Sequence, residues 1–179
     1  AGGIRAARLM DQFSNGATTA MLEDIARRVA PLGWHIEINI AKCADWVDLE
    51  PRLARCPVPL VFDHLGRPRG GEGLDQPGFK VIRRLLSERD DCWTKISSFY
   101  RLSDAGPPHF EDMAPFARAL LADRPDRCVW GTNWPHPGLQ DFMPNDADLL
   151  DLLESWIPRE AMREPLFASN AARLYRFAP

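Results

Sequence analysis

Three apolar segments of this chain are each followed directly by polar side chains that could carry out chemistry. The segments are PLVFDHLGRP at 59–68, CWTKISSFYRLS at 92–103 and CVWGTNWPHP at 128–137. Each contains a short apolar run typical of a buried strand, and two of the three then turn at Gly and Pro residues. The pattern predicts a row of strands that bring reactive groups together at one end of a sheet.

Histidine and arginine are the residue types in these segments with the widest chemical use. His64 and His136 could accept a proton, polarise a carbonyl group when protonated, or bind a metal. Arg67 and Arg101 could each hold a carboxylate through two parallel hydrogen bonds, because the guanidinium is planar and stays charged. Asn133 is different, because an amide neither titrates nor binds zinc well.

Other candidate residues have mainly structural interpretations. Lys95 lies inside a predicted strand, where a buried lysine is costly, so a role as a Schiff-base or electrophilic lysine stays open. Asp63 would point to the face opposite His64 in a regular strand, and we expect it to be structural. His35 and His109 stand apart from the three segments and are also expected to be structural.

Strands and helices are predicted to alternate along the whole chain. Apolar runs and alternating patterns predict strands at 3–10, 35–41, about 60–64, 92–97 and 128–134. Apolar residues at helical spacing predict helices between them and a last helical segment at 169–177. The expected helix caps are Thr18 or Thr19, Asp48, Asp75 and Asn145, and Gly33 is expected to end the first helix.

This alternation indicates parallel strand pairing, because each helix returns the chain to the same end of the sheet. An open dinucleotide-binding sheet needs a glycine fingerprint directly after a strand, and Gly70, Gly71 and Gly73 follow Pro68 without that spacing. A barrel fits better, because its catalytic groups lie at the carboxyl ends of several strands. The candidates at such ends are Arg8, Asn39, His64, Lys95, Ser97 and Asn133.

Composition predicts one globular domain over residues 1–179. The chain is 45% apolar, with 6 Trp and 9 Phe, which is enough to bury a core. Its net charge of −3 is spread over interspersed acidic and basic residues, which argues against nucleic acid and membrane surfaces as partners. Without a spanning segment or a signal peptide in this sequence, we expect a cytoplasmic protein.

The four cysteines, Cys43, Cys56, Cys92 and Cys128, have no C-x-x-C spacing. We expect free, buried thiols, with a disulfide or a zinc cluster as the alternative.

Four segments together resemble one known family. DHLGRP at 63–68, WTKISSFYRLS at 93–103, VWGTNWPHP at 129–137 and NAARLYRF at 170–177 resemble the 2-pyrone-4,6-dicarboxylate lactonase branch of the amidohydrolase superfamily. The resemblance covers nearly the whole chain, in order. It implies the α/β class and a (β/α)8 TIM barrel of amidohydrolase type. Because a barrel needs eight strands, we expect an incomplete barrel of about five β/α units, strands four to eight.

The resemblance also implies roles for individual residues. His64, Asn133 and His136 are the expected catalytic residues; the expected substrate-binding residues are Arg8 (or Arg5), Tyr100, Arg67 and Arg101. Asn133 stands where the family often carries Asp. The base would then be His64, His136 or a residue of the missing strands, or hydrolysis would be lost and only ligand binding kept.

The first strand of the family carries an H-x-H motif, and the four histidines of this chain are all isolated. The chain also begins at Ala1 without Met, so we expect a fragment that lacks the first three strands. We predict that this chain by itself binds no metal, and that a divalent metal requires the missing H-x-H.

The resemblance implies a hydrolase of a small carboxylate-bearing lactone, similar to 2-pyrone-4,6-dicarboxylate, that uses water attack on the ring carbonyl in aromatic-compound degradation. One alternative is a non-oxidative decarboxylase of the same superfamily. The other is a non-catalytic partial barrel, because a five-stranded parallel sheet leaves edges exposed. A homo-oligomer or the missing N-terminal half would cover those edges.

Overall fold

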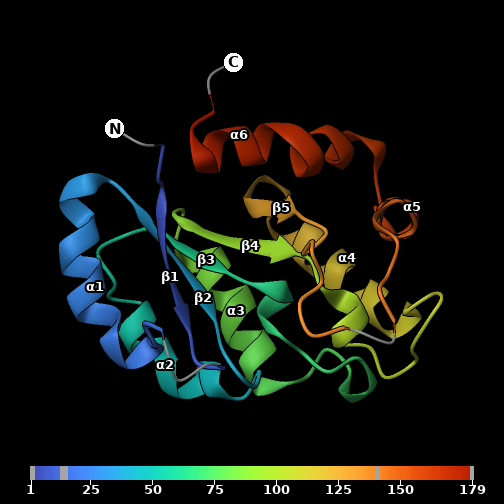
Figure 1. The fold of residues 1–179 in the computed structure, drawn as a ribbon, viewed down its shortest axis with the longest axis horizontal. Coiled ribbons are helices and arrows are strands. Elements are labelled where there is room, and N and C mark those ends of the chain that lie inside the picture. Colours follow the sequence, from blue (N-terminus) through green and yellow to red (C-terminus); the bar gives the residue numbers. More distant parts are fainter. Residues whose placement is uncertain (1–2, 13–15, 140–141, 178–179) are drawn as a thin grey trace.

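The computed structural model describes residues 3–12, 16–139 and 142–177. One parallel sheet runs through the molecule, with its strands in the order β1-β2-β3-β4-β5 (Figure 1). Each strand pairs with the next one in the sequence, whereas the strand order of a doubly wound sheet reverses at a switch point. The order is that of a partial barrel, as predicted. The strands are β1 (Ala6–Met10), β2 (His35–Asn39), β3 (Leu60–Phe62), β4 (Cys92–Ile96) and β5 (Cys128–Trp130).

Helices follow the strands in the predicted alternation. They are α1 (Leu22–Val29), α2 (Asp45–Leu53), α3 (Pro77–Glu88), α4 (Ala114–Asp123), α5 (Asp146–Trp156) and α6 (Asn170–Tyr175). Asn145 caps α5 as predicted, since its side chain accepts a hydrogen bond from the backbone N–H of Ala147 at 2.8 Å. Gly33 follows α1 in the left-handed conformation that favours glycine.

Three helix starts differ from the predicted ones. Helix α1 begins at Leu22, after a 3-10 turn over Thr19–Met21, and Thr18 forms no side-chain capping hydrogen bond. Helix α2 begins at Asp45 rather than after Asp48, because the earlier turn buries Trp46, whose indole N–H donates to the Gly66 carbonyl at 2.7 Å. Helix α3 begins after Gln76 rather than after Asp75. For α2, a tertiary contact that the local pattern does not contain thus moves the start of the helix by about one turn.

The two faces of the sheet have different coverings. The face toward the helices is apolar and packs into the main core through residues such as Ile36, Ile38, Leu60, Phe62 and Ile96. On the opposite, inner face, Val61, Trp93 and Val129 form a smaller apolar cluster with Leu174 of α6. The same face also carries charged side chains: Arg8 pairs in register with Glu37, Glu37 pairs with Val61, and Lys95 pairs with Val129.

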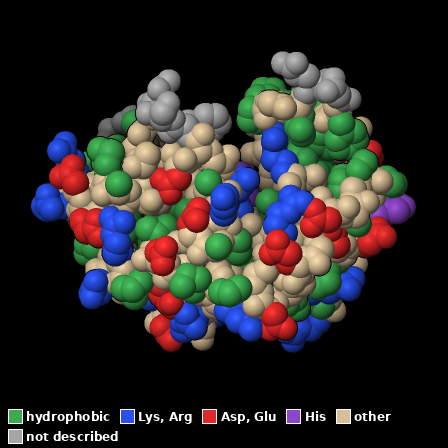
Figure 2. All heavy atoms as spheres, turned by 90° about the horizontal axis from the view of Figure 1, so that it is seen from below, with side chains coloured by type: hydrophobic (Ala, Val, Ile, Leu, Met, Phe, Trp, Pro, Cys, Tyr) green, Lys and Arg blue, Asp and Glu red, His purple; other side chains and the backbone are tan. Residues whose placement is uncertain are grey.

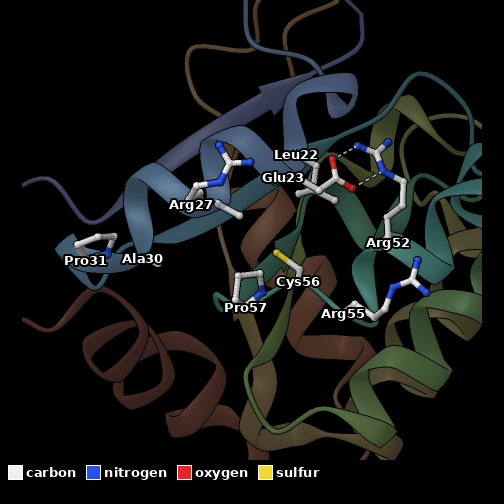
Figure 3. Close-up of a pocket in the computed structure, with 10 residues that line it drawn as sticks. Leu22, Glu23, Arg27, Ala30, Pro31, Arg52, Arg55, Cys56 and Pro57 are labelled. Atoms are coloured by element: carbon white, nitrogen blue, oxygen red, sulfur yellow. Dashed lines mark hydrogen bonds and ion pairs between the residues drawn. The ribbon is translucent and has the colours of Figure 1, made fainter.

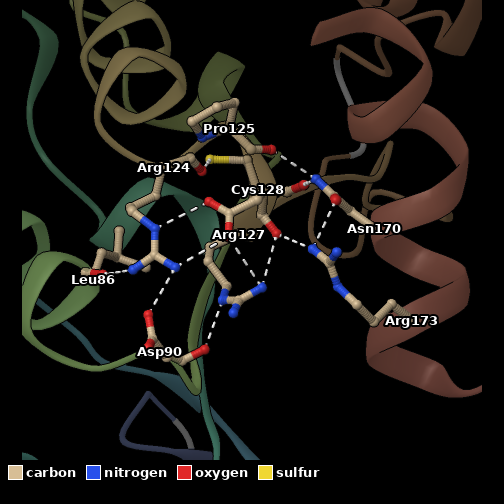
Figure 4. A network of polar contacts seen from close by, with 9 residues as sticks. Leu86, Asp90, Arg124, Pro125, Arg127, Cys128, Asn170 and Arg173 are labelled. Atoms are coloured by element: carbon tan, nitrogen blue, oxygen red, sulfur yellow. Dashed lines mark hydrogen bonds and ion pairs between the residues drawn. The ribbon is translucent and has the colours of Figure 1, made fainter.

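Helix α6 lies at the end of the molecule where β1 begins (Figure 1). Asn170 and Arg173 of this helix point toward the start of β5, as Figure 4 shows. Asn170 is buried, and its amide donates to the carbonyl oxygens of Pro125 at 2.8 Å and Cys128 at 2.7 Å. The helix thus seals the amino-terminal end of the inner face and leaves the carboxyl end open.

The distribution of surface charge and the state of the cysteines match what the sequence predicted. Acidic and basic side chains are interspersed over the face seen in Figure 2. All four cysteines are free and buried, as predicted. Across the described residues, no helix has both the length and the apolar character that crossing a bilayer requires.

Candidate active site

The carboxyl ends of the strands enclose a hollow of about 250 Å³. Among its lining are three residues predicted for the site, Arg8, His64 and Asn133, which come from β1 and from the turns after β3 and β5. Asp63, Lys95 and Ser97 also line it. The strand ends therefore converge as the barrel interpretation requires.

The floor of the hollow is a network of four charged side chains. Arg8 donates to one oxygen of Asp63 through Nε at 2.9 Å and Nη2 at 2.5 Å. Lys95 Nζ lies 3.0 Å from the other oxygen of Asp63 and 2.8 Å from Glu37. The hydroxyl of Tyr175 donates to Glu37 at 3.1 Å. The two cations and two anions of this network compensate one another, which lowers the free-energy cost of burying their charges.

The expectation that Asp63 points away from the hollow is wrong. The strand ends at Phe62, and the next residues leave the extended conformation, with φ of +56° at both His64 and Leu65. Alternation of side chains holds only within a regular strand. Asp63 and His64 therefore reach the same hollow.

The charged network also changes the interpretation of two basic residues. Burial by itself lowers the pKa of Lys95, but Asp63 and Glu37 outweigh it and raise the pKa above its ordinary value. A lysine that stays protonated is a poor nucleophile, which disfavours the Schiff-base role. Arg8, expected to hold substrate, is engaged with Asp63, and Arg5 donates to the carbonyl oxygen of Tyr175.

His64 is buried in the wall of the hollow. Its Nδ1 lies 2.8 Å from the hydroxyl of Ser97. Burial is the main cause that lowers its pKa to about 4, and the cations Arg8, Arg67 and Lys95 lower it further against the effect of Asp63. The imidazole is therefore neutral near neutral pH, so it can accept a proton but does not act as a cationic electrophile.

Asn133 lies in a left-handed conformation, with φ of +72°, that Asn and Asp adopt more readily than most residues. Its amide nitrogen donates to the hydroxyls of Ser98 at 3.2 Å and Tyr100 at 2.9 Å. His136, buried behind it, contacts Tyr100 through Nδ1 at 2.8 Å. Tyr100 and His136 are thus one step removed from the hollow.

Arg67 and Arg101 line a separate cavity of about 300 Å³, together with Lys42, Arg69 and one acidic residue, Glu72, so that its basic side chains outnumber its acidic one. Burial, followed by the neighbouring Arg101 and Arg69, lowers the pKa of Arg67. Its Nε is buried without a hydrogen-bond partner among the residues that the structure describes. A guanidinium held near other cations and left unpaired is suited to binding an anion. The turn that links the cavities is closed by the Arg67 N–H, which donates to the His64 carbonyl at 2.7 Å.

A larger cavity, of about 650 Å³, lies between α1 and α2 (Figure 3). Its charged rim includes Glu23, which is paired with Arg52 at 2.6 Å. Its inner wall includes the thiol of Cys56, whose pKa is raised by burial. It holds none of the predicted site residues.

Comparison with known proteins identifies the family. The amidohydrolase family matches residues 1–177. The chain belongs to the amidohydrolase family. It is 37% identical to the 2-pyrone-4,6-dicarboxylate hydrolase of Comamonas testosteroni over 161 aligned residues. The aligned segment covers 86% of this chain and 52% of the relative. It is 34% identical over 175 residues to the 4-sulfomuconolactone hydrolase of Hydrogenophaga intermedia, with 97% and 57% covered.

Solved structures agree with this assignment. An apo Agrobacterium tumefaciens protein superposes with a TM-score of 0.83 at 32% identity, over 97% of this chain and 61% of that one. A zinc-bound amidohydrolase of Burkholderia multivorans shares the fold, with a TM-score of 0.74 at 23% identity, over 98% and 65%. The chain thus spans little more than half the length of the curated relatives, and the predicted α/β amidohydrolase fold is confirmed as a partial barrel.

Amidohydrolases often bind a divalent metal, so we tested whether the hollow suits one. The carboxylate of Asp63 is shared by Arg8 and Lys95, and Nδ1 of His64 faces Ser97. Over the described ranges of the chain, His, Cys, Asp and Glu side chains form no group of three or more that could hold a metal. These donors alone do not fit a metal ion, which would need further ligands.

The sequence interpretation did not identify Lys42, Arg69, Glu37 and Asp146 as neighbours of the site. Arg69 lies two residues after Arg67, and this repeat of basic residues within one turn is a signal that could have indicated it. The other three residues carry no comparable local signal.

Proposed function

We propose that this protein hydrolyses a small lactone that carries carboxylates, similar to 2-pyrone-4,6-dicarboxylate, in the degradation of aromatic compounds. The main support is that one turn carries both the neutral imidazole of His64 and Arg67 of the cationic cavity, and the Arg67 N–H closes this turn onto the His64 carbonyl oxygen at 2.7 Å. The names of the relatives, a pyrone dicarboxylate hydrolase and a sulfomuconolactone hydrolase, agree with an anionic lactone as substrate.

In this proposal, Arg67 and Arg101 hold a substrate carboxylate and so fix the ring over the hollow. Lys42 and Arg69 add positive charge to the same cavity. The anion supplies Arg67 with the partner that it lacks among the described residues, which favours binding.

His64 is the proposed base. It accepts a proton from water as the water oxygen attacks the ring carbonyl carbon. The ring C–O bond then breaks, and the proton returns to the leaving oxygen. The net reaction consumes one water molecule and converts the lactone to a hydroxy acid or its keto form. Asn133 lies in the same hollow and offers an amide oxygen as a hydrogen-bond acceptor.

We further propose a cytoplasmic location, no nucleic-acid or membrane partner, and a homo-oligomer or an N-terminal half that covers the sheet edges. The decarboxylase alternative uses a divalent metal, for which the donors of the hollow are not suited by themselves.

The test is loss of ring absorbance for a panel of pyrone and muconolactone acids, measured on the longest natural form of the protein. We expect His64→Ala to lower turnover by about 100-fold or more, since it removes the base. A rise in turnover of Asn133→Asp would show instead that a carboxylate base was missing at this position and that His64 is not a sufficient base. The exposed His109 provides the matched control, His109→Ala, with unchanged turnover.

A rate untouched by His64→Ala would rule out the assigned base. Lack of turnover with every lactone in the panel would rule out the proposed function and favour a non-catalytic barrel.

A further inference from the structure

We infer that Asp146, His136 and Tyr100 form a hydrogen-bond relay that orients the side-chain amide of Asn133, with its carbonyl oxygen left as the acceptor for the hollow. This inference rests on the proposed function, because it assigns positioning residues to the same site. The relay joins the turn after β5, the turn after β4 and the start of α5.

The contacts of the relay form one continuous chain. His136 Nε2 lies 3.0 Å from Asp146 Oδ1, and His136 Nδ1 lies 2.8 Å from the hydroxyl oxygen of Tyr100. Asn133 Nδ2 lies 2.9 Å from that same oxygen and 3.2 Å from Ser98 Oγ. Each of these distances is within the range of a hydrogen bond.

The direction of each hydrogen bond follows from the chemistry of the groups. A carboxylate can only accept, so His136 carries its proton on Nε2 and donates to Asp146. Nδ1 of His136 is then an acceptor, and the hydroxyl of Tyr100 donates to it. The oxygen of Tyr100 is left to accept, which requires the nitrogen of Asn133, rather than its oxygen, to face Tyr100. An imidazole with protons on both nitrogens would leave the Tyr100 proton without an acceptor.

Burial makes the order of donors and acceptors strict at His136 and Tyr100, whereas the Asp146 side chain at the end of the relay is 41% exposed. The side chain of His136 is 1% exposed, and Tyr100 as a whole is 9% exposed. A buried polar group without a partner is costly, so a reversed amide would place the oxygens of Asn133 and Tyr100 against each other. The backbone supports the arrangement, because the N–H of His136 donates to the Asn133 carbonyl at 2.9 Å.

The consequence is a neutral acceptor of defined orientation. With both N–H groups engaged, Oδ1 of Asn133 is the polar atom left for a water molecule in the hollow. An aspartate here would add negative charge beside an anionic substrate, whereas the amide accepts a hydrogen bond without that repulsion. Asp146, His136 and Tyr100 act through Asn133 and are positioning residues.

Long-range ¹H–¹⁵N NMR of the histidine side chains tests the relay without any need for turnover. We expect His136 to be protonated on Nε2 only, and the Asn133 side-chain N–H signals to be protected from solvent exchange. Tyr100→Phe removes only the hydroxyl and should reduce that protection, because Ser98 is then the one remaining acceptor of the two. His136 protonated on Nδ1, or Asn133 signals unchanged in Tyr100→Phe, would overturn the relay.

Kinetics with 2-pyrone-4,6-dicarboxylate test whether the relay serves the reaction. We expect Asp146→Asn to lower kcat by about tenfold while KM changes less than about threefold, because a shifted acceptor affects the chemical step more than substrate binding. Asp148→Asn is the matched control: Asp148 is exposed in the same first turn of α5, and its loss should leave both constants unchanged. Equal effects of the two variants would overturn the positioning role.

The two proposals fail in different ways. If the protein turns over no lactone but His136 has the expected tautomer, the proposed function is wrong and the relay stands as the structure that orients Asn133. If turnover is present and the tautomer is reversed, the relay is wrong and the proposed function stands.

Discussion

Asp63 and Arg8 are 55 residues apart in the sequence, and one carboxylate oxygen of Asp63 accepts two hydrogen bonds from the Arg8 guanidinium, at 2.9 and 2.5 Å. The Asp63 side chain is 0% exposed, and Lys95 approaches its other oxygen at 3.0 Å. This carboxylate therefore holds two cations at the floor of the hollow.

Asp63→Ala leaves Lys95 and Arg8 without their shared anion. We expect the free energy of unfolding to fall by about 3 kcal/mol, since breaking a buried ion pair leaves an uncompensated charge. Urea titration measures the change. Asp75→Ala is the control, because the Asp75 side chain is 95% exposed and its loss should not alter the midpoint. Equal midpoints for both variants would show that the floor network contributes nothing to stability.

Arg67→Met should separate stability from ligand binding. The variant removes a half-buried charge whose Nε lacks a partner in the described part of the chain, so we expect the free energy of unfolding to rise by about 1 kcal/mol. Affinity for 2-pyrone-4,6-dicarboxylate should fall by about 100-fold, measured by calorimetry. Arg28→Met, at a side chain 72% exposed, should change neither value. A loss of stability together with unchanged affinity would contradict the anion-binding role.

His64 should make stability depend on pH in a defined window. Because burial lowers its pKa to about 4 from an ordinary value of 6.5, the unfolded chain binds more protons than the folded one between these values. The free energy of unfolding should therefore rise with pH across this window, by roughly 3 kcal/mol. Above pH 6.5 the contribution of His64 should no longer change with pH.

Unfolding titrations of the wild type and His64→Gln at several pH values check this expectation. The variant should have a flatter profile between pH 4 and 6.5. Below that window both proteins should still lose stability. Burial by itself raises the pKa of Glu37, but His35 and Lys95 outweigh it and lower this pKa to about 2. Parallel profiles for the two proteins across the upper window would exclude His64 as the titrating group.

Asn170→Ala should loosen helix α6 from the start of β5. It removes both hydrogen bonds that Asn170 donates, to the carbonyls of Pro125 and Cys128 (Figure 4). We expect a loss of about 2 kcal/mol in the free energy of unfolding, because two buried carbonyl groups lose their donor. Ser169→Ala, which removes an exposed hydroxyl bonded to Glu164, is the control with little effect. A midpoint equal to that of the wild type would show that these two hydrogen bonds do not hold the helix in place.

Local pattern was sufficient to predict the main features of the fold. Apolar runs and helical spacing depend on neighbouring residues, so the strand–helix alternation and the cap at Asn145 were predicted correctly. The start of α2 was not, because the burial of Trp46 and its hydrogen bond to Gly66 link segments that are 20 residues apart.

The sequence alone determined that polar residues after several strands come together, because a parallel sheet brings the strand ends to one edge; it did not determine that Asp63 joins them. His64, Arg8 and Asn133 meet there as predicted. Only the tertiary structure decided their partners: Asp63 engages Arg8, and Asp146 and Tyr100 flank His136. The physical reason is that the energies of charge pairing and hydrogen bonding depend on separation in space, and residues tens of positions apart acquire that separation only when the chain folds.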